Sequence, residues 1–141
     1  MMENKDLSNS VIFSKGELLP EQFRKNFIGQ TYLNMIVPST SPLGCPIGNV
    51  TFAPGSRNNW HKHPGGQILL VTGGRGWYQE EGKAARELHA GDVVEIPSNV
   101  KHWHGAAKDS WFVHIAIEAN AKAGPAEWME PVTDEEYFKL K

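Results

Sequence analysis

Glycine and proline interrupt the middle of this chain so often that helices of ordinary length cannot form there. The sequence holds 14 Gly and 9 Pro in 141 residues. Eight of the glycines fall within fewer than forty positions, namely Gly55, Gly65, Gly66, Gly73, Gly74, Gly76, Gly82 and Gly91. Both residue types disfavour helix interiors and favour turns. This part of the chain must therefore fold as short strands joined by turns.

Short runs rich in β-branched and aromatic residues lie between these breaks, and such runs predict strands. They are Gln30–Val37, Gly48–Ala53, Gln67–Thr72, Gly76–Glu80, Ala84–His89, Asp92–Ile96 and Ser110–Glu118. In the last run the odd positions from Trp111 are apolar, whereas His114, Ala116 and Glu118 occupy even positions. This period of two places one face on a packed core and the other on a more polar space. Many short strands predict an all-β fold, a single antiparallel β-barrel or jelly roll.

Helices are expected only near the two ends of the chain. Glu21–Asn26 follows Pro20, and Thr133 with Glu136 forms the capping-box pattern that opens a helix through Leu140. The length suits one domain of ~100–200 residues. We expect an N-terminal extension with a short strand or helix over 1–26 and the barrel over 27–120. Residues 121–141 should add a strand and a short helix that pack on the barrel or on a partner.

Composition and charge exclude several classes of protein. With 14 Lys+Arg against 16 Asp+Glu the net charge is −2, and no basic run suggests nucleic-acid binding. The longest apolar stretch, residues 68–71, is too short to span a membrane. Residues 1–6 lack the apolar core of an export signal, so we expect a cytoplasmic protein. Cys45, the single cysteine, is expected to be a small buried side chain rather than a nucleophile.

Histidines gather in a pattern typical of a metal site. His61 and His63 lie two apart, so in an extended chain both rings face the same side. Gln67 opens the next predicted strand and can bring a carbonyl oxygen to the same point, and His102 can add a third nitrogen. Three imidazoles and one amide oxygen leave coordination positions open, as in catalytic metal sites. Without a thiolate, Mn²⁺, Fe²⁺, Co²⁺, Ni²⁺ and Zn²⁺ all remain possible.

A pair of surface histidines is the alternative for His61 and His63 taken alone, but their surroundings follow a longer pattern. That pattern is Gly55-x5-His61-x-His63-x3-Gln67-x6-Gly74, then Gly91-x5-Pro97-x-Asn99-x2-His102. It resembles the two sequence motifs of the cupin superfamily, whose RmlC-like fold is a small antiparallel barrel or jelly roll. Gln67 stands where most cupins carry Glu. Asn99 stands where Gly is usual, in a turn in which Asn tolerates a positive φ.

Longer segments narrow the resemblance. The chain is similar to the manganese-dependent bacterial cupin hydroxynitrile lyases from about Phe27 to Tyr137, above all in Trp60–Gln67, Gly74–Trp77, His89–Val94, Lys101–Ala106 and Glu127–Glu135. In that family three histidines and one glutamine hold the metal. The resemblance therefore implies His61, His63, Gln67 and His102 as ligands of one divalent metal ion per chain, with Mn²⁺ first and Fe, Ni, Zn or Co as alternatives.

Other side chains are expected to line the space beside the metal. His104 shares strand parity with His102, and a neutral imidazole suits proton transfer near neutral pH. We expect His104 and His114 to be catalytic, although either can instead be a hydrogen-bonded core histidine. Gly48 and Val50, on the family pattern, and Glu118 at the barrel mouth are expected to contact the substrate.

The remaining aromatic and basic residues are assigned by their neighbours in sequence. Trp60 and Trp103 each precede or follow an inward histidine, so their side chains should point away from the cavity. Arg57 and Arg75 lie near turns and are expected to face solvent, as is His89.

Three functions are compatible with these residues. The first is a metal-dependent lyase on a small oxygenated substrate, such as a cyanohydrin cleaved to an aldehyde and cyanide. The others are an iron-dependent dioxygenase and a non-catalytic small-molecule-binding protein. We expect a homodimer or homotetramer, with Trp128 and Met129 as apolar anchors.

Overall fold

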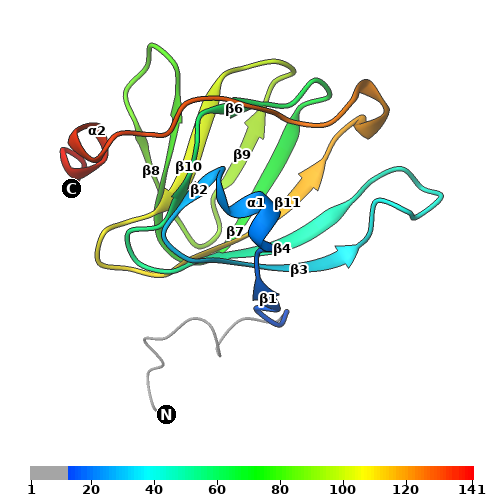
Figure 1. Cartoon of the computed structure of the whole chain (residues 1–141), viewed down its shortest axis with the longest axis horizontal. Helices are drawn as coiled ribbons and strands as arrows, with labels where there is room; N and C mark the ends of the chain where they lie inside the picture. The colour runs from blue at the N-terminus through cyan, green and yellow to red at the C-terminus, as the bar shows by residue number, and fades with distance from the viewer. Residues whose placement is uncertain (1–12) are drawn as a thin grey trace.

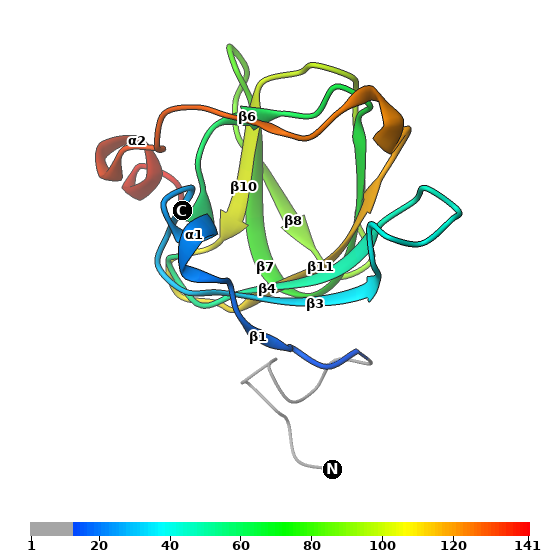
Figure 2. The ribbon, with the colours of Figure 1, turned by 45° about the vertical axis from the view of Figure 1, so that its right-hand side comes forward.

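The strands form two antiparallel sheets that curl around a shared interior (Figures 1 and 2). The computed structural model describes residues 13–141. Its strands run in the order β1-β3-β4-β11-β7-β10-β5-β2, with β6, β8, β9 and β12 attached to this path. The prediction of an all-β antiparallel barrel is confirmed.

The long strands are β3 (Thr31–Val37), β4 (Ile47–Phe52), β7 (Gln67–Glu80), β8 (Arg86–His89), β9 (Val93–Ile96), β10 (His102–Ala106) and β11 (Phe112–Glu118). The short ones are β1 (Glu17–Leu18), β2 (Phe27–Ile28), β5 (Arg57–Asn58), β6 (His61–Lys62) and β12 (Glu127–Trp128). The helices are α1 (Glu21–Arg24), the 3₁₀ turn η1 (Ala121–Ala123) and α2 (Asp134–Phe138).

Strand β7 belongs to both sheets, and here the prediction of two separate strands, Gln67–Thr72 and Gly76–Glu80, is wrong. Its first half pairs with β9 and β11, and its second half pairs with β8 and β10. Gly74 has φ +76° where the pairing passes from one sheet to the other, and just before it the register with β11 shifts between the pairs His114–Val71 and Val113–Gly73. The glycines therefore bend the strand from one sheet to the other instead of ending it.

The other long strands except β10 lie within one or two residues of the predicted runs. The terminal helix and its cap are confirmed, since Thr133 Oγ1 accepts from the Glu136 backbone at 3.1 Å. No strand was predicted at β2 or β5, because two residues carry no period, whereas β1 and β12 lie in the terminal segments where short strands were expected. Strand β10 was missing from the predicted runs as well.

Two apolar clusters lie on opposite faces of the sheet that contains β5, β6, β8, β10 and the second half of β7. One fills the interior around Phe52, Leu69 and Phe112. The other packs Trp60, Trp77, Trp103 and Ala107 against Val132 and Tyr137 of the C-terminal segment, residues 121–141. The prediction that Trp60 and Trp103 point away from the cavity is confirmed, and their histidine neighbours consequently face inward.

Arg57 corrects the expectation of a solvent-facing side chain, because only 1% of it is exposed. Its guanidinium donates to Val132 O and Asp134 Oδ1, and its carbon Cζ lies 4.2 Å from the Tyr137 ring centroid. The C-terminal segment covers this arginine, which no local pattern around residue 57 reveals. The side chain of Arg75 is 23% exposed, whereas that of His89 is 56% exposed.

Residues 1–12 lie outside the described part, and with them the start of the predicted N-terminal extension and the segment judged for an export signal. Within residues 13–141, no helix has the length and apolar character needed to cross a membrane.

Candidate metal and active site

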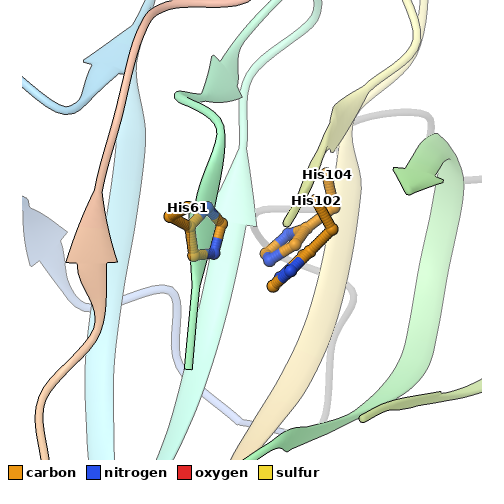
Figure 3. A group of neighbouring side chains, drawn as sticks. All are labelled: His61, His102 and His104. Atoms are coloured by element: carbon orange, nitrogen blue, oxygen red, sulfur yellow. The ribbon is translucent and has the colours of Figure 1, made fainter. Parts of the chain in front are cut away.

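His61 and His102 face each other across two paired strands. Strand β6 pairs with β10 so that His61 and His102 are direct partners, and their ring centroids lie 4.3 Å apart. Figure 3 shows the His61 ring opposite those of His102 and His104, which project from β10 on the same side. Strand register therefore brings together two histidines that are far apart in the sequence.

Backbone carbonyls fix the orientation of both rings. Nδ1 of His61 lies 2.7 Å from Asn59 O, and Nδ1 of His102 lies 2.8 Å from Val100 O. Because a carbonyl oxygen only accepts, each Nδ1 carries the hydrogen and each Nε2 keeps its lone pair. Nε2 of His102 is buried without a hydrogen-bond partner. A cation is the ligand that such lone pairs fit.

His63 and Gln67 lie beside this pair. The His63 ring centroid is 5.0 Å from that of His61 and 5.6 Å from that of His102. Both ring nitrogens of His63 and Oε1 of Gln67 are buried without a hydrogen bond. Gln67 Nε2 donates to Glu118 Oε1 at 2.5 Å, and Glu118 Oε2 lies 3.1 Å from His63 Nδ1.

His104 and His114 form a separate pair deeper in the barrel. His114 Nε2 and His104 Nδ1 lie 3.2 Å apart, within hydrogen-bond distance. Asn58 Nδ2 lies 3.2 Å from His104 Nε2, and Asn58 Oδ1 accepts from the His104 backbone at 2.9 Å. His114 Nδ1 has no partner. Both rings of this pair are thus held in place inside the cavity wall.

Burial keeps these imidazoles neutral. Loss of solvent, reinforced by the nearby His102 ring, holds the pKa of His61 well below its ordinary value. Burial lowers the pKa of His102 to about 4 and that of His114 to about 3. The pKa of His104 is well below its ordinary value because of burial and the neighbouring His114. At neutral pH all four rings therefore offer lone pairs rather than charge.

A cavity of about 560 Å³ opens from these histidines toward the barrel mouth. Most of its wall is apolar and includes Phe27, Leu33, Phe52 and Trp128. Gly48, Val50 and Glu118, expected to contact the substrate, line it, as do His61, His63, Gln67, His104 and His114. His102 is fully buried behind this surface. The cavity thus joins a polar end to an apolar chamber, an arrangement that suits a small organic molecule.

Two groupings of metal-binding atoms are geometrically available. One ligand atom each from His61, His102 and His104 lies within 4.8 Å of the others. The predicted set replaces His104 with His63 and adds Gln67. His61, His63 and Gln67 line the cavity, and the His102 ring lies behind them, 4.3 Å from that of His61 and 5.6 Å from that of His63. Both ring nitrogens of His63 and Oε1 of Gln67 lack a hydrogen-bond partner, whereas both ring nitrogens of His104 have one. The donor set fits a divalent cation of borderline or hard character.

Two residues of the site escaped the sequence interpretation. Asn58 contacts His104, and Trp128, assigned to subunit association, lines the cavity. The polar run Ser56–Asn59 is buried throughout, but in sequence it looks like a solvated turn. Its position just before Trp60 and His61 was the available signal.

Known proteins share this architecture and much of the sequence. The family model of the Cupin domain matches residues 48–118. An (R)-mandelonitrile lyase of Granulicella tundricola is 44% identical over 111 residues, which cover 79% of this chain and 85% of that protein.

Solved structures agree with these sequence matches. A cupin-like protein from Thermotoga maritima is 50% identical with a TM-score of 0.85, covering 91% of this chain and 95% of that one. A cupin 2 conserved barrel domain protein from Rhodopseudomonas palustris shares the fold at a TM-score of 0.67 and 14% identity, with coverages of 88% and 81%. This chain belongs to the cupin family.

Proposed function

We propose that this protein is a metal-dependent lyase that cleaves a cyanohydrin to an aldehyde and hydrogen cyanide. The observation that carries the proposal is a cluster of buried, neutral imidazoles at the polar end of an apolar cavity. The likeness to an (R)-mandelonitrile lyase, at 44% identity, supports the choice of reaction.

His61, His63, Gln67 and His102 would hold the metal, and Mn²⁺ is the ion we propose. Three nitrogens and one amide oxygen are neutral donors, so the ion keeps its full positive charge. When bound, the metal supplies Lewis acidity to an oxygen of the substrate. Fe, Ni, Zn and Co suit the same donors, so metal content has to be measured.

His104 and His114 would accept and return the hydroxyl proton of the substrate. The hydroxyl proton of the cyanohydrin passes to one ring of this pair, the carbon–carbon bond breaks, and its electrons leave with cyanide. The proton then returns to cyanide, which gives hydrogen cyanide and the aldehyde. Because His104 Nδ1 and His114 Nε2 lie 3.2 Å apart, the two rings can share the proton. Asn58 holds His104 in place for this exchange.

The cavity favours a substrate with one oxygenated end and an apolar body. Phe27, Phe52 and Trp128 supply aromatic surface, and Gly48 and Val50, on the same face of β4 as Phe52, leave room beside it. An aryl cyanohydrin such as mandelonitrile places its phenyl ring in the chamber and its hydroxyl at the histidines.

The test is benzaldehyde release from mandelonitrile by Mn²⁺-loaded protein. We expect turnover that is lost in His61→Ala and kept in His89→Ala, which removes an exposed imidazole of the same type. Equal rates for the wild-type protein and His61→Ala contradict the proposal. Oxygen uptake by iron-loaded protein with diketones or thiols, in the absence of mandelonitrile cleavage, favours the dioxygenase alternative.

We also propose that the protein is a homodimer or homotetramer. Exposed apolar side chains at Leu18, Phe23 and Met35 supply surface for association. A mass near 15.7 kDa in solution, that of one chain, contradicts this proposal.

A further inference from the structure

We infer that Glu118 is a positioning residue that orients Gln67 and His63, two of the four proposed ligands, and supplies the negative charge that the ligands lack. The inference rests on the metal site of the proposed function. Glu118 would then support the metal ligands as well as contact the substrate.

The contact with Gln67 decides which end of the amide faces the site. A glutamine side chain can present either its oxygen or its NH₂ group, and only the oxygen binds a cation. Gln67 Nε2 donates to Glu118 Oε1 at 2.5 Å, which leaves Oε1 of Gln67 buried without a partner. A carboxylate is a strong acceptor for such a bond. Glu118 thus selects the rotamer in which the oxygen is available.

The contact with His63 favours the tautomer of its imidazole that leaves a lone pair for a metal. Glu118 Oε2 lies 3.1 Å from His63 Nδ1, although the ring is not turned into hydrogen-bond geometry. A carboxylate at this nitrogen favours the tautomer with hydrogen on Nδ1 and a lone pair on Nε2. His61 and His102 achieve this with backbone carbonyls, Asn59 O and Val100 O. Metal-bound histidines usually have such a second partner.

The strand register places Glu118 at this point. Glu118 and Gln67 are direct partners in the antiparallel pairing of β11 with β7. Directly opposed side chains of an antiparallel pair lie close together on the same face of the sheet. The contact is therefore built into the barrel wall and does not depend on a loop.

The charge of Glu118 lacks a basic partner. Among the described residues, no lysine or arginine lies within 4.0 Å of this carboxylate, and His63 Nδ1 is the one nitrogen of a basic side chain within that distance. Its side chain is 33% exposed, yet its oxygens turn toward the two ligands. Imidazole and amide ligands supply no negative charge to a bound metal, so a cation among them gains from this nearby carboxylate.

The test compares Mn²⁺ affinity in Glu118→Ala, Glu118→Gln and a matched control, Glu95→Ala, which removes an exposed carboxylate of β9. Dissociation constants come from the electron paramagnetic resonance signal of free Mn²⁺, and the visible spectrum of Co²⁺-loaded protein reports ligand geometry. We expect Glu118→Ala to weaken Mn²⁺ binding about 10- to 100-fold, the usual effect of losing such an outer partner. The Co²⁺ spectrum should change as well.

Glu118→Gln should recover part of the affinity, because its amide oxygen still accepts from Gln67 while the charge is lost. The melting temperature of the metal-free protein should remain that of the wild type, and Glu95→Ala should bind Mn²⁺ normally. Affinity within twofold of wild type in Glu118→Ala, or an equal loss of metal-free stability, overturns the inference. A wild-type protein that binds Mn²⁺ but leaves mandelonitrile intact contradicts only the proposed reaction.

Discussion

Trp128 stacks on His61, with ring centroids 4.5 Å apart and planes inclined by 29°. The two residues are direct partners in the pairing of β12 with β6, so the C-terminal segment forms part of the site wall. Phe27 packs on the same indole at 5.5 Å. The expectation that Trp128 serves association did not foresee this position, because strand β12 has two residues and no periodic pattern.

Replacing Trp128 should change substrate binding. Trp128→Ala removes the stacking surface on His61 and opens the cavity, so kcat/KM for mandelonitrile should fall about 2- to 10-fold, the worth of an aromatic pair. Bulkier aryl cyanohydrins should lose less. Steady-state kinetics on the Mn²⁺-loaded protein measure both effects.

Trp128→Phe keeps an aromatic ring at this place and should retain most of the activity. Trp111→Phe is the control, since Trp111 packs on Tyr32 and is absent from the cavity wall. An unchanged kcat/KM in Trp128→Ala would show that the indole does not contact the substrate.

Single substitutions distinguish the two groupings of ligand atoms. His63→Ala should lower Mn²⁺ affinity at least about 10-fold, because it removes a ligand. His104→Ala should keep the metal and lose turnover, since His104 is engaged with Asn58 and His114. Metal content after dialysis is the measurement. Metal loss in His104→Ala with retention in His63→Ala would instead favour the group of His61, His102 and His104.

The metal-free protein should lose stability in mild acid. Burial lowers the pKa of His114 to about 3 and that of His102 to about 4, while in the unfolded chain both have a pKa of ~6.5. Protons therefore bind the unfolded state first as the pH falls. The contribution of these groups is complete above pH ~6.5 and declines toward pH ~4, with a slope up to about 1.4 kcal/mol per pH unit for each histidine.

Urea unfolding between pH 8 and pH 4 measures this slope. His114→Phe should flatten the profile, because one titrating group is removed and a ring still packs between Phe52 and Phe112. His89→Gln, at an exposed position, should leave it unchanged. A wild-type profile that is flat below pH 6 would refute the prediction.

The inward orientation of the histidines could be predicted from the sequence, because it depends only on neighbouring residues in the same strand. Alternation fixes the face of each residue in a strand, which was enough to set His61 and His102 inside and Trp60 and Trp103 outside. The glycines of β7 misled the strand prediction, since the same residues that end a strand also permit a bend within it.

Contacts that depend on register or on the C-terminal segment could not be predicted. Glu118 meets Gln67 only because β11 pairs with β7 in one particular alignment. Asn58 reaches His104 across the neighbouring strands β5 and β10. Each alignment depends on two segments that are far apart in the sequence, so no single segment predicts it.

Arg57 should be a main anchor of the C-terminal segment. Its guanidinium, 1% exposed, donates to Val132 O at 2.8 Å and to Asp134 Oδ1 at 2.7 Å. Arg57→Leu leaves the Val132 carbonyl buried without a donor and should lower the free energy of unfolding by about 2–4 kcal/mol. Asp134→Asn should cost less than about 1 kcal/mol, because the Asp134 side chain is 77% exposed. Urea denaturation of the metal-free variants gives both values, and equal losses would mean that the exposed ion pair, rather than the buried hydrogen bonds to Val132, holds the segment.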